Sequence, residues 1–294
     1  MYERELSVYR TLSTQKSEQI SDSAYDLLNI YVTSYTNYTQ TINAQTFLEW
    51  LSRYPLKQNS KRTVAHIVGK FFNTFEIFSV EQFDIIKRSF KAKPLDWSSK
   101  VIDDNRLQSF FKELENRPIC EFSMLRDMAA FTLLLVSGIR ISQLIELSSN
   151  DVKLEDDYTH FFFRAKKQNE LSTLSSDINE KKIPNSAGYL KYNLRNLLEN
   201  YLDLQRYVKK ENYVFLNLYG KQLTAQHFRN VCNELDPNGN ITPHSFRHTA
   251  ISNVANKHGI YKANVLAGHK NINTTKYYIK PKQEDIEDAY SKSN

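Results

Sequence analysis

The sequence predicts a mainly helical protein with a small β-hairpin or sheet, organised as two domains. Apolar side chains recur at helical spacing over long stretches, as Leu28, Tyr31 and Val32 do near the N-terminus. Two short runs, His160–Lys166 and Glu180–Pro184, instead have the pattern of strands joined by a polar loop. A chain of 294 residues is long enough for two domains that each bury a hydrophobic core.

The N-terminal domain is expected to be a small helical bundle over residues 1–93. Helical periodicity extends over residues 21–52 and 60–90, and Pro55 interrupts it. Proline, serine and basic residues then replace the periodic pattern at 94–100, which favours a linker between the domains.

The C-terminal domain, residues 101–294, is expected to mix helices with short strands around its own core. Met124–Val136 is a continuous apolar segment that predicts a central helix, and Gly138 predicts the end of that helix. Pro281 stops the last helical pattern, so residues 279–294 are expected to form a separate C-terminal tail.

Composition places the chain among globular proteins rather than membrane or disulfide-rich ones. It is 40% hydrophobic and 24% charged, and it has no apolar run long enough to span a bilayer. The N-terminus Met1–Glu5 is charged and has no apolar core behind it, so no signal peptide is expected. Two isolated cysteines, Cys120 and Cys232, do not form a disulfide framework, which favours a reducing cytoplasm.

Charge is unevenly distributed along the chain. The net charge is +6, yet residues 1–50 hold three Lys/Arg against six Asp/Glu, whereas residues 57–93 hold eight against three. This second stretch is predicted to contact a phosphate backbone, and its alternative is an ordinary solvated face. The predicted DNA-contacting residues are Lys57, Lys61, Arg62, Lys70, Lys87, Arg88, Lys91 and Lys93.

Arg140 follows the Ser137–Gly138 turn, in the first turn of the next predicted helix. Free backbone N–H groups and the positive end of a helix dipole lie at such a place, and together with a guanidinium they favour a phosphate. The alternative for Arg140 is a buried salt bridge with Glu146 or another acid.

Three further motifs lie within forty residues near the C-terminus. They are Thr242–Thr249, Leu266–His269 and Thr274–Tyr278. On a helix, His244 and Arg247 would project from one face because they are three residues apart. The set offers an arginine for a phosphate, two histidines to move protons, and a phenol that can attack.

A metal site is the competing interpretation of the same residues. His244 and His248 are four apart, which suits a pair of ligands on a helix. However, no Glu follows His244 as a metalloprotease motif requires, and nearby arginines would repel a cation. The sequence therefore predicts no metal and no cofactor.

Taken in order, these motifs resemble those of the tyrosine recombinase or phage integrase family, in the compact Xer-type form. That pattern has an arginine after a glycine turn, a hairpin lysine, His-x-x-Arg, Gly-His, and a tyrosine nine residues later. The matching residues are Arg140, Lys166, His244, Arg247, His269 and Tyr278. Many members have an acid three residues after the first arginine, where this chain has Gln143, and Glu146 would compensate for that missing acid.

The resemblance implies a role for each residue. Arg140 and Arg247 would hold the non-bridging oxygens of the scissile phosphate and neutralise its growing charge. His244 would take the proton of Tyr278, whose phenol has an ordinary pKa of about 10 and needs activation. His269 would donate to a phosphoryl oxygen.

Two assignments stay open. The general acid of the family is a lysine near the tip of the hairpin, which is Lys166 or, after a slip of one residue, Lys167. The nucleophile is Tyr278 by spacing from His269, and Tyr277 is the alternative.

The resemblance implies a site-specific recombinase of double-stranded DNA, working through a 3′-phosphotyrosine linkage and a Holliday junction. The N-terminal core-binding domain and the catalytic domain would close around the duplex. A tetramer on DNA, a monomer off DNA and no membrane partner are expected. The alternatives are a type IB topoisomerase-like relaxase and a non-catalytic DNA-binding protein of the same fold.

Overall fold

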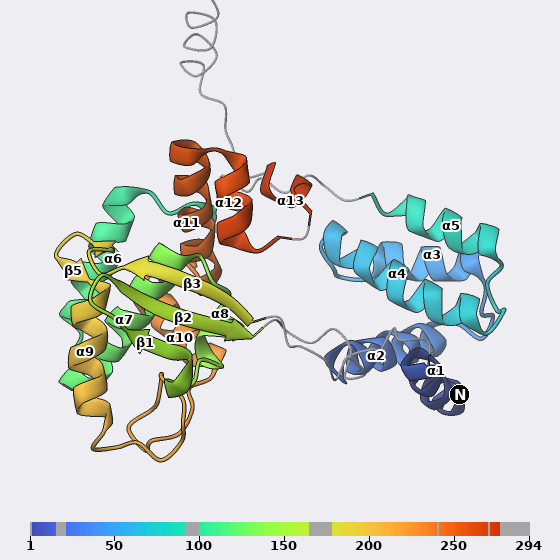
Figure 1. Cartoon of the computed structure of the whole chain (residues 1–294). Coiled ribbons are helices and arrows are strands. Elements are labelled where there is room, and N and C mark those ends of the chain that lie inside the picture. Colours follow the sequence, from blue (N-terminus) through green and yellow to red (C-terminus); the bar gives the residue numbers. More distant parts are fainter. Residues whose placement is uncertain are drawn as a thin grey trace, which may run out of the picture. The chain divides into compact units, whose positions relative to one another are not determined.

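The computed structural model describes residues 2–15, 22–91, 100–164, 178–239, 241–269 and 271–276. These residues form two compact units, one within the first 95 residues and one from residue 100 onward (Figure 1). None of the described helices is long and apolar enough to cross a membrane.

Helices are the only regular secondary structure in the described part of the N-terminal unit. They are α1 (Glu3–Gln15), α2 (Asp22–Tyr38), α3 (Ala44–Arg53), α4 (Gln58–Thr74) and α5 (Val80–Ser89). The expectation of one helical stretch over 21–52 and another over 60–90 was wrong in detail, because each contains a break. Asn43 caps α3 through its side chain, and Ser79 caps α5 in the same way. Helix α1 had not been predicted.

Aromatic side chains fill the core of this unit. Phe47, Phe71, Phe72 and Phe78 are fully buried. The buried hydroxyl of Tyr35 donates to the Asn43 carbonyl at 2.9 Å, so its polar end is satisfied. Burial of each large ring contributes roughly 2–3 kcal/mol of hydrophobic stabilisation.

The second unit combines helices with two small sheets. Its helices are α6 (Asp104–Glu115), α7 (Glu121–Ser137), α8 (Ile141–Ile145), α9 (Leu194–Gln205), α10 (Ala225–Leu235), α11 (Pro243–His258), α12 (Ile260–Ala267) and α13 (Asn273–Lys276), with a 3₁₀ turn at Ser149–Asp151. Its strands are β1 (Val152–Leu154), β2 (Tyr158–Arg164), β3 (Ile178–Pro184), β4 (Gly188–Tyr189) and β5 (Tyr192–Asn193). A mainly helical fold with small sheets is thus confirmed.

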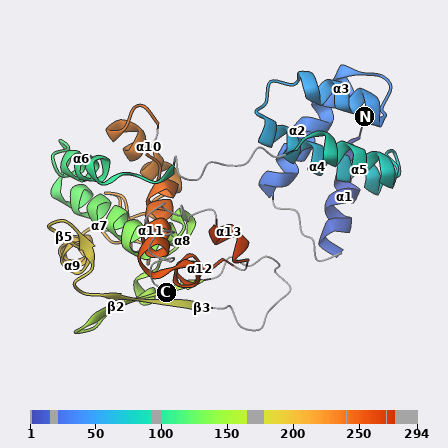
Figure 2. The same cartoon turned by 90° about the horizontal axis from the view of Figure 1, so that it is seen from above.

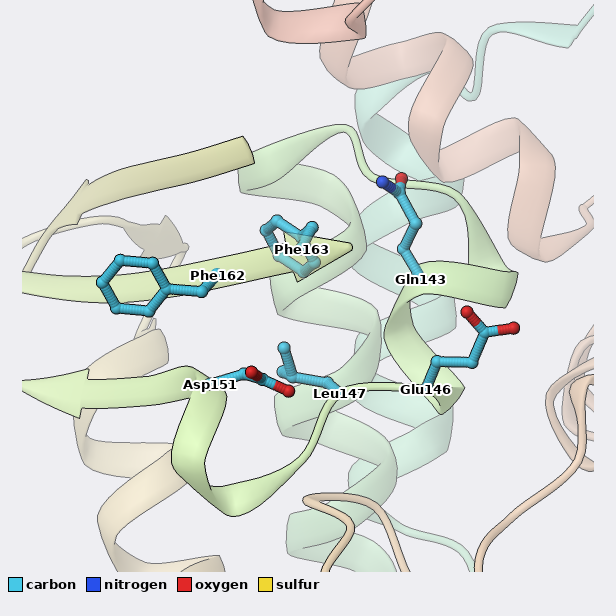
Figure 3. A pocket seen from close by; sticks show the side chains of 6 residues that line it. All are labelled: Gln143, Glu146, Leu147, Asp151, Phe162 and Phe163. Carbon is cyan, nitrogen blue, oxygen red and sulfur yellow. The ribbon is translucent and has the colours of Figure 1, made fainter. Parts of the chain in front are cut away.

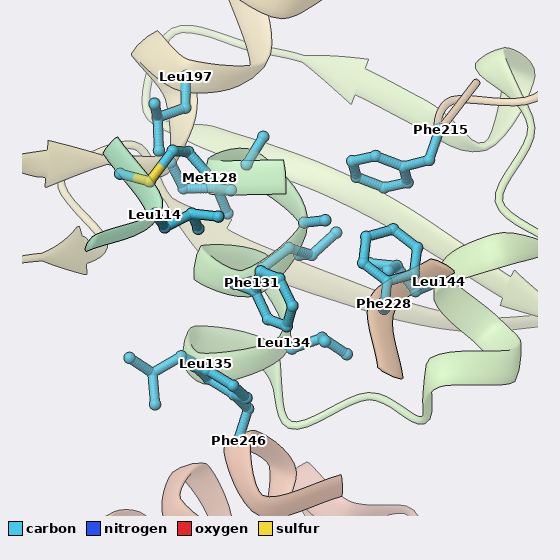
Figure 4. Packing of buried hydrophobic residues seen from close by; sticks show 14 of the residues in the cluster. Leu114, Met128, Phe131, Leu134, Leu135, Leu144, Leu197, Phe215, Phe228 and Phe246 are labelled. Atoms are coloured by element: carbon cyan, nitrogen blue, oxygen red, sulfur yellow. The ribbon is translucent and has the colours of Figure 1, made fainter. Parts of the chain in front are cut away.

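Helix α7 is the centre of this unit, as the apolar segment predicted. Almost every residue from Phe122 to Leu135 is buried, and α9 and α11 pack against it. Figure 4 shows Phe131 of α7 between Phe228 of α10 and Phe246 of α11. The helix ends where Gly138 turns into the left-handed region with φ 61°.

Strands β1, β2 and β3 form an antiparallel sheet in that order. The predicted pairing of the two hairpin strands is confirmed, and its register places Lys181 opposite Phe161. Strand β3 is an edge strand, and helices α11 and α12 lie beside it (Figure 1, Figure 2). Lys166 and Lys167, which were expected near the tip of this hairpin, lie outside the described residues.

Candidate active site

Arg140 lies at the start of α8, as the N-cap residue. Its side chain is exposed, and the side-chain oxygen of Gln143 accepts a hydrogen bond from the Arg140 backbone N–H at 3.0 Å. Gln143 therefore orients the backbone of Arg140 without taking up its charge. The alternative ion pair between Arg140 and Glu146 is not formed between these two described residues.

Glu146 instead borders a small hollow between α8, the 3₁₀ turn and β2. Figure 3 shows the lining residues, which are Gln143, Glu146, Leu147, Asp151, Phe162 and Phe163. The Asp151 carboxylate accepts from the Ser148 N–H at 3.0 Å and from the Ser148 hydroxyl at 2.5 Å. This hollow is therefore apolar and acidic, and it is unsuited to a phosphate.

Arg247 is only 2% exposed on α11. One terminal nitrogen donates to the carbonyl of Gly138, and the other donates to the carbonyl of Ala267 at 2.7 Å. A buried guanidinium is tolerated only where its N–H groups are paired, and these carbonyls supply partners. The fork of Arg247 consequently joins the end of α7 to the end of α12.

His269, two residues beyond α12, contacts the same guanidinium. Its Nε2 lies 3.1 Å from Nη2 of Arg247, and its Nδ1 lies 2.9 Å from the Thr275 hydroxyl. Arginine can only donate, so Nε2 must accept, and the ring proton sits on Nδ1 and points to Thr275. The hydroxyl of Thr275 donates a hydrogen bond to the side-chain oxygen of Asn264 at 2.7 Å.

This arrangement fixes the tautomer of His269. Burial, followed by the charge of Arg247, lowers the pKa of His269 to about 4, so the ring is neutral at pH 7. In this state Nε2 of His269 accepts a hydrogen bond from Arg247 and helps to hold its guanidinium in place. Its predicted donation to a phosphoryl oxygen needs a proton on Nε2 and stays a prediction.

His244 lies near the start of α11, three residues before Arg247, as expected. Desolvation, followed by the charges of Arg247 and Lys100, lowers its pKa. Its ring meets that of His248 edge to face at 4.3 Å between centroids. His248 is buried, and desolvation together with His244 lowers its pKa to about 3. The lowered pKa values keep both rings neutral near pH 7, and neither environment favours a cation.

Lys181 on β3 is a site residue that sequence reasoning missed. Its ammonium donates to the carbonyl of Ser137 at 2.7 Å and to that of Leu266. Burial, followed by the charges of Arg247 and Arg140, lowers its pKa to about 7. The alternation of strands could have revealed it, because Lys181 shares a face with buried Ile183 while Lys182 is exposed.

The remaining predicted catalytic residues cannot be placed. Lys166 and Tyr278, with their alternatives Lys167 and Tyr277, lie outside the described residues. Thr275, three residues before Tyr278 in the sequence, is fully buried.

The predicted DNA-contacting residues of the N-terminal unit lie on or near its surface. Lys57, Arg62, Lys87, Arg88 and Lys91 are exposed, Lys61 and Lys70 are half-buried, and Lys93 lies outside the described residues. After desolvation, the charges of Lys70, Lys87 and Arg62 each lower the pKa of His66. These three cations of α4 and α5 thus lie close enough to His66 to act on its charge.

Known proteins have sequences similar to that of this chain. The model of the phage integrase family matches residues 100–285. Tyrosine recombinase XerC of Leptospira interrogans is 28% identical over 187 residues, which cover 62% of this chain and 55% of the relative. XerC of Staphylococcus aureus is 22% identical over 253 residues, which cover 84% of this chain and 79% of the relative. The chain thus matches about half the length of the first of these relatives.

Solved structures share the fold. The Tn1549 transposon integrase in complex with circular intermediate DNA has a TM-score of 0.69 at 17% identity, covering 97% of this chain and 98% of that one. A lambda integrase dimer bound to a core site has a TM-score of 0.66 at 13% identity, covering 95% of each chain. Because the family model matches more than half of the sequence, this chain belongs to the phage integrase family.

Proposed function

We propose that this protein is a site-specific DNA recombinase that cleaves and rejoins strands through a 3′-phosphotyrosine intermediate and a Holliday junction. The observation that carries the proposal is the position of Arg247. Its buried fork joins two helix ends, one leading to Arg140 and the other to His269. Residues more than a hundred positions apart thereby meet at one cationic site.

The chemistry follows from these positions. Arg140 and Arg247 neutralise the charge that builds on the scissile phosphate. His244, neutral at pH 7, accepts the proton of Tyr278, which attacks the phosphorus. Lys166 protonates the departing 5′ oxygen. The phosphotyrosine bond conserves the energy of the phosphodiester, so rejoining needs no other energy source.

The partner we propose is double-stranded DNA with specific recombination sites. The core-binding domain, residues 1–93, contributes the exposed cations around His66, and residues 101–294 contribute the catalytic site. A linker at 94–100 joins the two domains, and assembly into a tetramer brings two duplexes together.

A nicked suicide duplex tests the proposal. Cleavage beside the nick releases a short 5′-hydroxyl fragment, so rejoining stops and the protein stays bound covalently. We expect a denaturant-resistant adduct with the wild type and with Tyr277→Phe, but none with Tyr278→Phe, which should still bind DNA. EDTA should leave adduct formation unchanged.

The other candidate activities give different results in the same assay. A DNA-binding protein without catalysis would form no adduct at any site. A type IB topoisomerase-like relaxase would form adducts and relax supercoiled DNA, but would not exchange strands between two duplexes. An adduct with Tyr278→Phe and none with Tyr277→Phe would show that the register is wrong.

A further inference from the structure

Two cations hold four backbone carbonyls at the ends of two helices. Helix α7 ends at Ser137 and helix α12 at Ala267, and both are followed by a glycine in the left-handed region. The contacts pair Arg247 with the carbonyls of Gly138 and Ala267, and Lys181 with those of Ser137 and Leu266.

These carbonyls need such partners. The last carbonyls of a helix have no partner within it, and they carry the negative end of the helix dipole. Two helix ends of the same sign meet here, so they would repel one another without a cation between them. Lys181 and Arg247 offset that repulsion and satisfy the open acceptors.

The carbonyls lie directly before predicted catalytic residues. Arg140 follows Ser137 by three residues, and His269 follows Leu266 by three. Any shift between the two helix ends would therefore move Arg140 relative to His269. Lys181 comes from a different element, the edge strand β3, and so joins both ends to the β2–β3 hairpin.

The lowered pKa of Lys181 is consistent with a position inside the candidate active site. Burial and the charges of Arg247 and Arg140 lower the pKa of Lys181, so it shares the field of the phosphate-binding residues. A negative phosphate beside the arginines would favour the charged ammonium. Lys182, the next residue, is exposed on the opposite face of the strand.

We infer that Lys181 is a positioning residue for strand cleavage, which holds the ends of α7 and α12 together with the β2–β3 hairpin. The inference rests on the proposed function. Lys181 acts through the backbone of Arg140 and His269, and its ammonium is committed to the Ser137 and Leu266 carbonyls.

The first test compares Lys181→Met with Lys182→Met on the suicide duplex, in a single turnover. We expect Lys181→Met to slow adduct formation about thirtyfold, with DNA affinity changed less than about twofold, because alignment rather than binding is lost. Lys181→Arg keeps the charge and two donors, so it should restore most of the rate. Lys182→Met should behave as the wild type.

A substrate with a 5′-bridging sulfur separates positioning from proton donation. A thiolate leaves without a general acid, so this duplex should rescue Lys166→Met but not Lys181→Met. Rescue of Lys181→Met would overturn the inference and make Lys181 the acid. Equal rates for Lys181→Met and wild type on the normal duplex would overturn it as well.

Amide hydrogen exchange provides a readout that does not depend on activity. In Lys181→Met, peptides containing Gly138–Arg140 and Gly268–His269 should exchange about tenfold faster, because both helix ends lose a partner. Lys182→Met should leave both unchanged. Unchanged exchange in Lys181→Met would sink the inference, whereas a wild type that forms no adduct would count against the proposed function alone. If Lys181→Met fails to fold, a folded Lys181→Arg without cleavage overturns the inference, and one with cleavage supports it.

Discussion

The two units of this protein hold their cations in opposite ways. In the N-terminal unit, Arg62 and Lys87 lie exposed on α4 and α5. In the second unit, Arg247 is buried and fixed by two carbonyls, and Lys181 is half-buried and fixed by two more. The same residue types thus occur once as exposed surface charges and once as buried or half-buried parts of the framework.

The difference matches two demands that DNA makes on a protein. Exposed cations attract a phosphate backbone at long range, and salt weakens that attraction strongly. Fixed cations in a partly desolvated site stabilise charge that develops in a transition state, because they need not reorganise. The first arrangement suits affinity and the second suits chemistry.

Replacement of Arg247 is the strongest test of this difference between the two units. Arg247→Ala should slow adduct formation at saturating DNA by about a thousandfold or more, because transition-state charge and the junction of two helix ends are both lost. Arg247→Lys keeps the charge but loses the fork, so a large part of the defect should remain. The exposed Arg229→Ala on α10 is the control. Full activity of Arg247→Ala would show that the buried cation has no role in cleavage.

Loss of the surface cations of the N-terminal unit should weaken DNA binding rather than cleavage. Replacing Arg62, Lys70 and Lys87 together by Gln should weaken DNA binding roughly a hundredfold at low salt and flatten its salt dependence. Cleavage at saturating DNA should stay near the wild-type rate. Measured binding isotherms at several salt concentrations check this, with Arg4, Arg10 and Arg53 replaced together as the control. A lost cleavage rate with unchanged affinity would reverse the division between the units.

A smaller effect should follow from the hydroxyl that orients His269. Thr275→Val keeps the shape but removes the acceptor for the Nδ1 proton, so we expect cleavage about tenfold slower. Nitrogen chemical shifts of His269 should show a changed tautomer. Thr274→Val, at the exposed neighbouring position, should change neither quantity. An unchanged tautomer in Thr275→Val would contradict the assigned direction of the hydrogen bonds.

The smallest effect concerns stability and pH. His248 has an ordinary pKa of about 6.5 when unfolded and about 3 when folded, so the unfolded chain binds its proton first as the pH falls. Stability should be unaffected by this group above pH 6.5 and should fall by about 2 kcal/mol between pH 6.5 and 5. Calorimetry of His248→Gln should show a weaker loss over that range, with His258→Gln as control. An equal loss in wild type and His248→Gln would contradict a buried neutral ring.

Short sequence motifs indicate part of the candidate site, and the catalytic roles of those residues stay predictions. Arg140, His244, Arg247 and His269 could be found because fixed spacings on helices and turns carry them. Strand alternation could have placed Lys181 on the buried face, but its partners could not be predicted, since they are helix ends more than forty residues before it and eighty after it. The two expected long helices proved to be four, because single caps such as Asn43 and Ser79 outweigh apolar periodicity over a few residues.

The burial of Thr275 connects three helices by hydrogen bonds. Thr275 lies on α13, and its hydroxyl lies between the ring of His269 and the side-chain oxygen of Asn264 on α12. His269 in turn contacts the guanidinium of Arg247 on α11. Two hydrogen bonds therefore separate a small buried hydroxyl from the buried arginine, and a change at the first would alter the environment of the second.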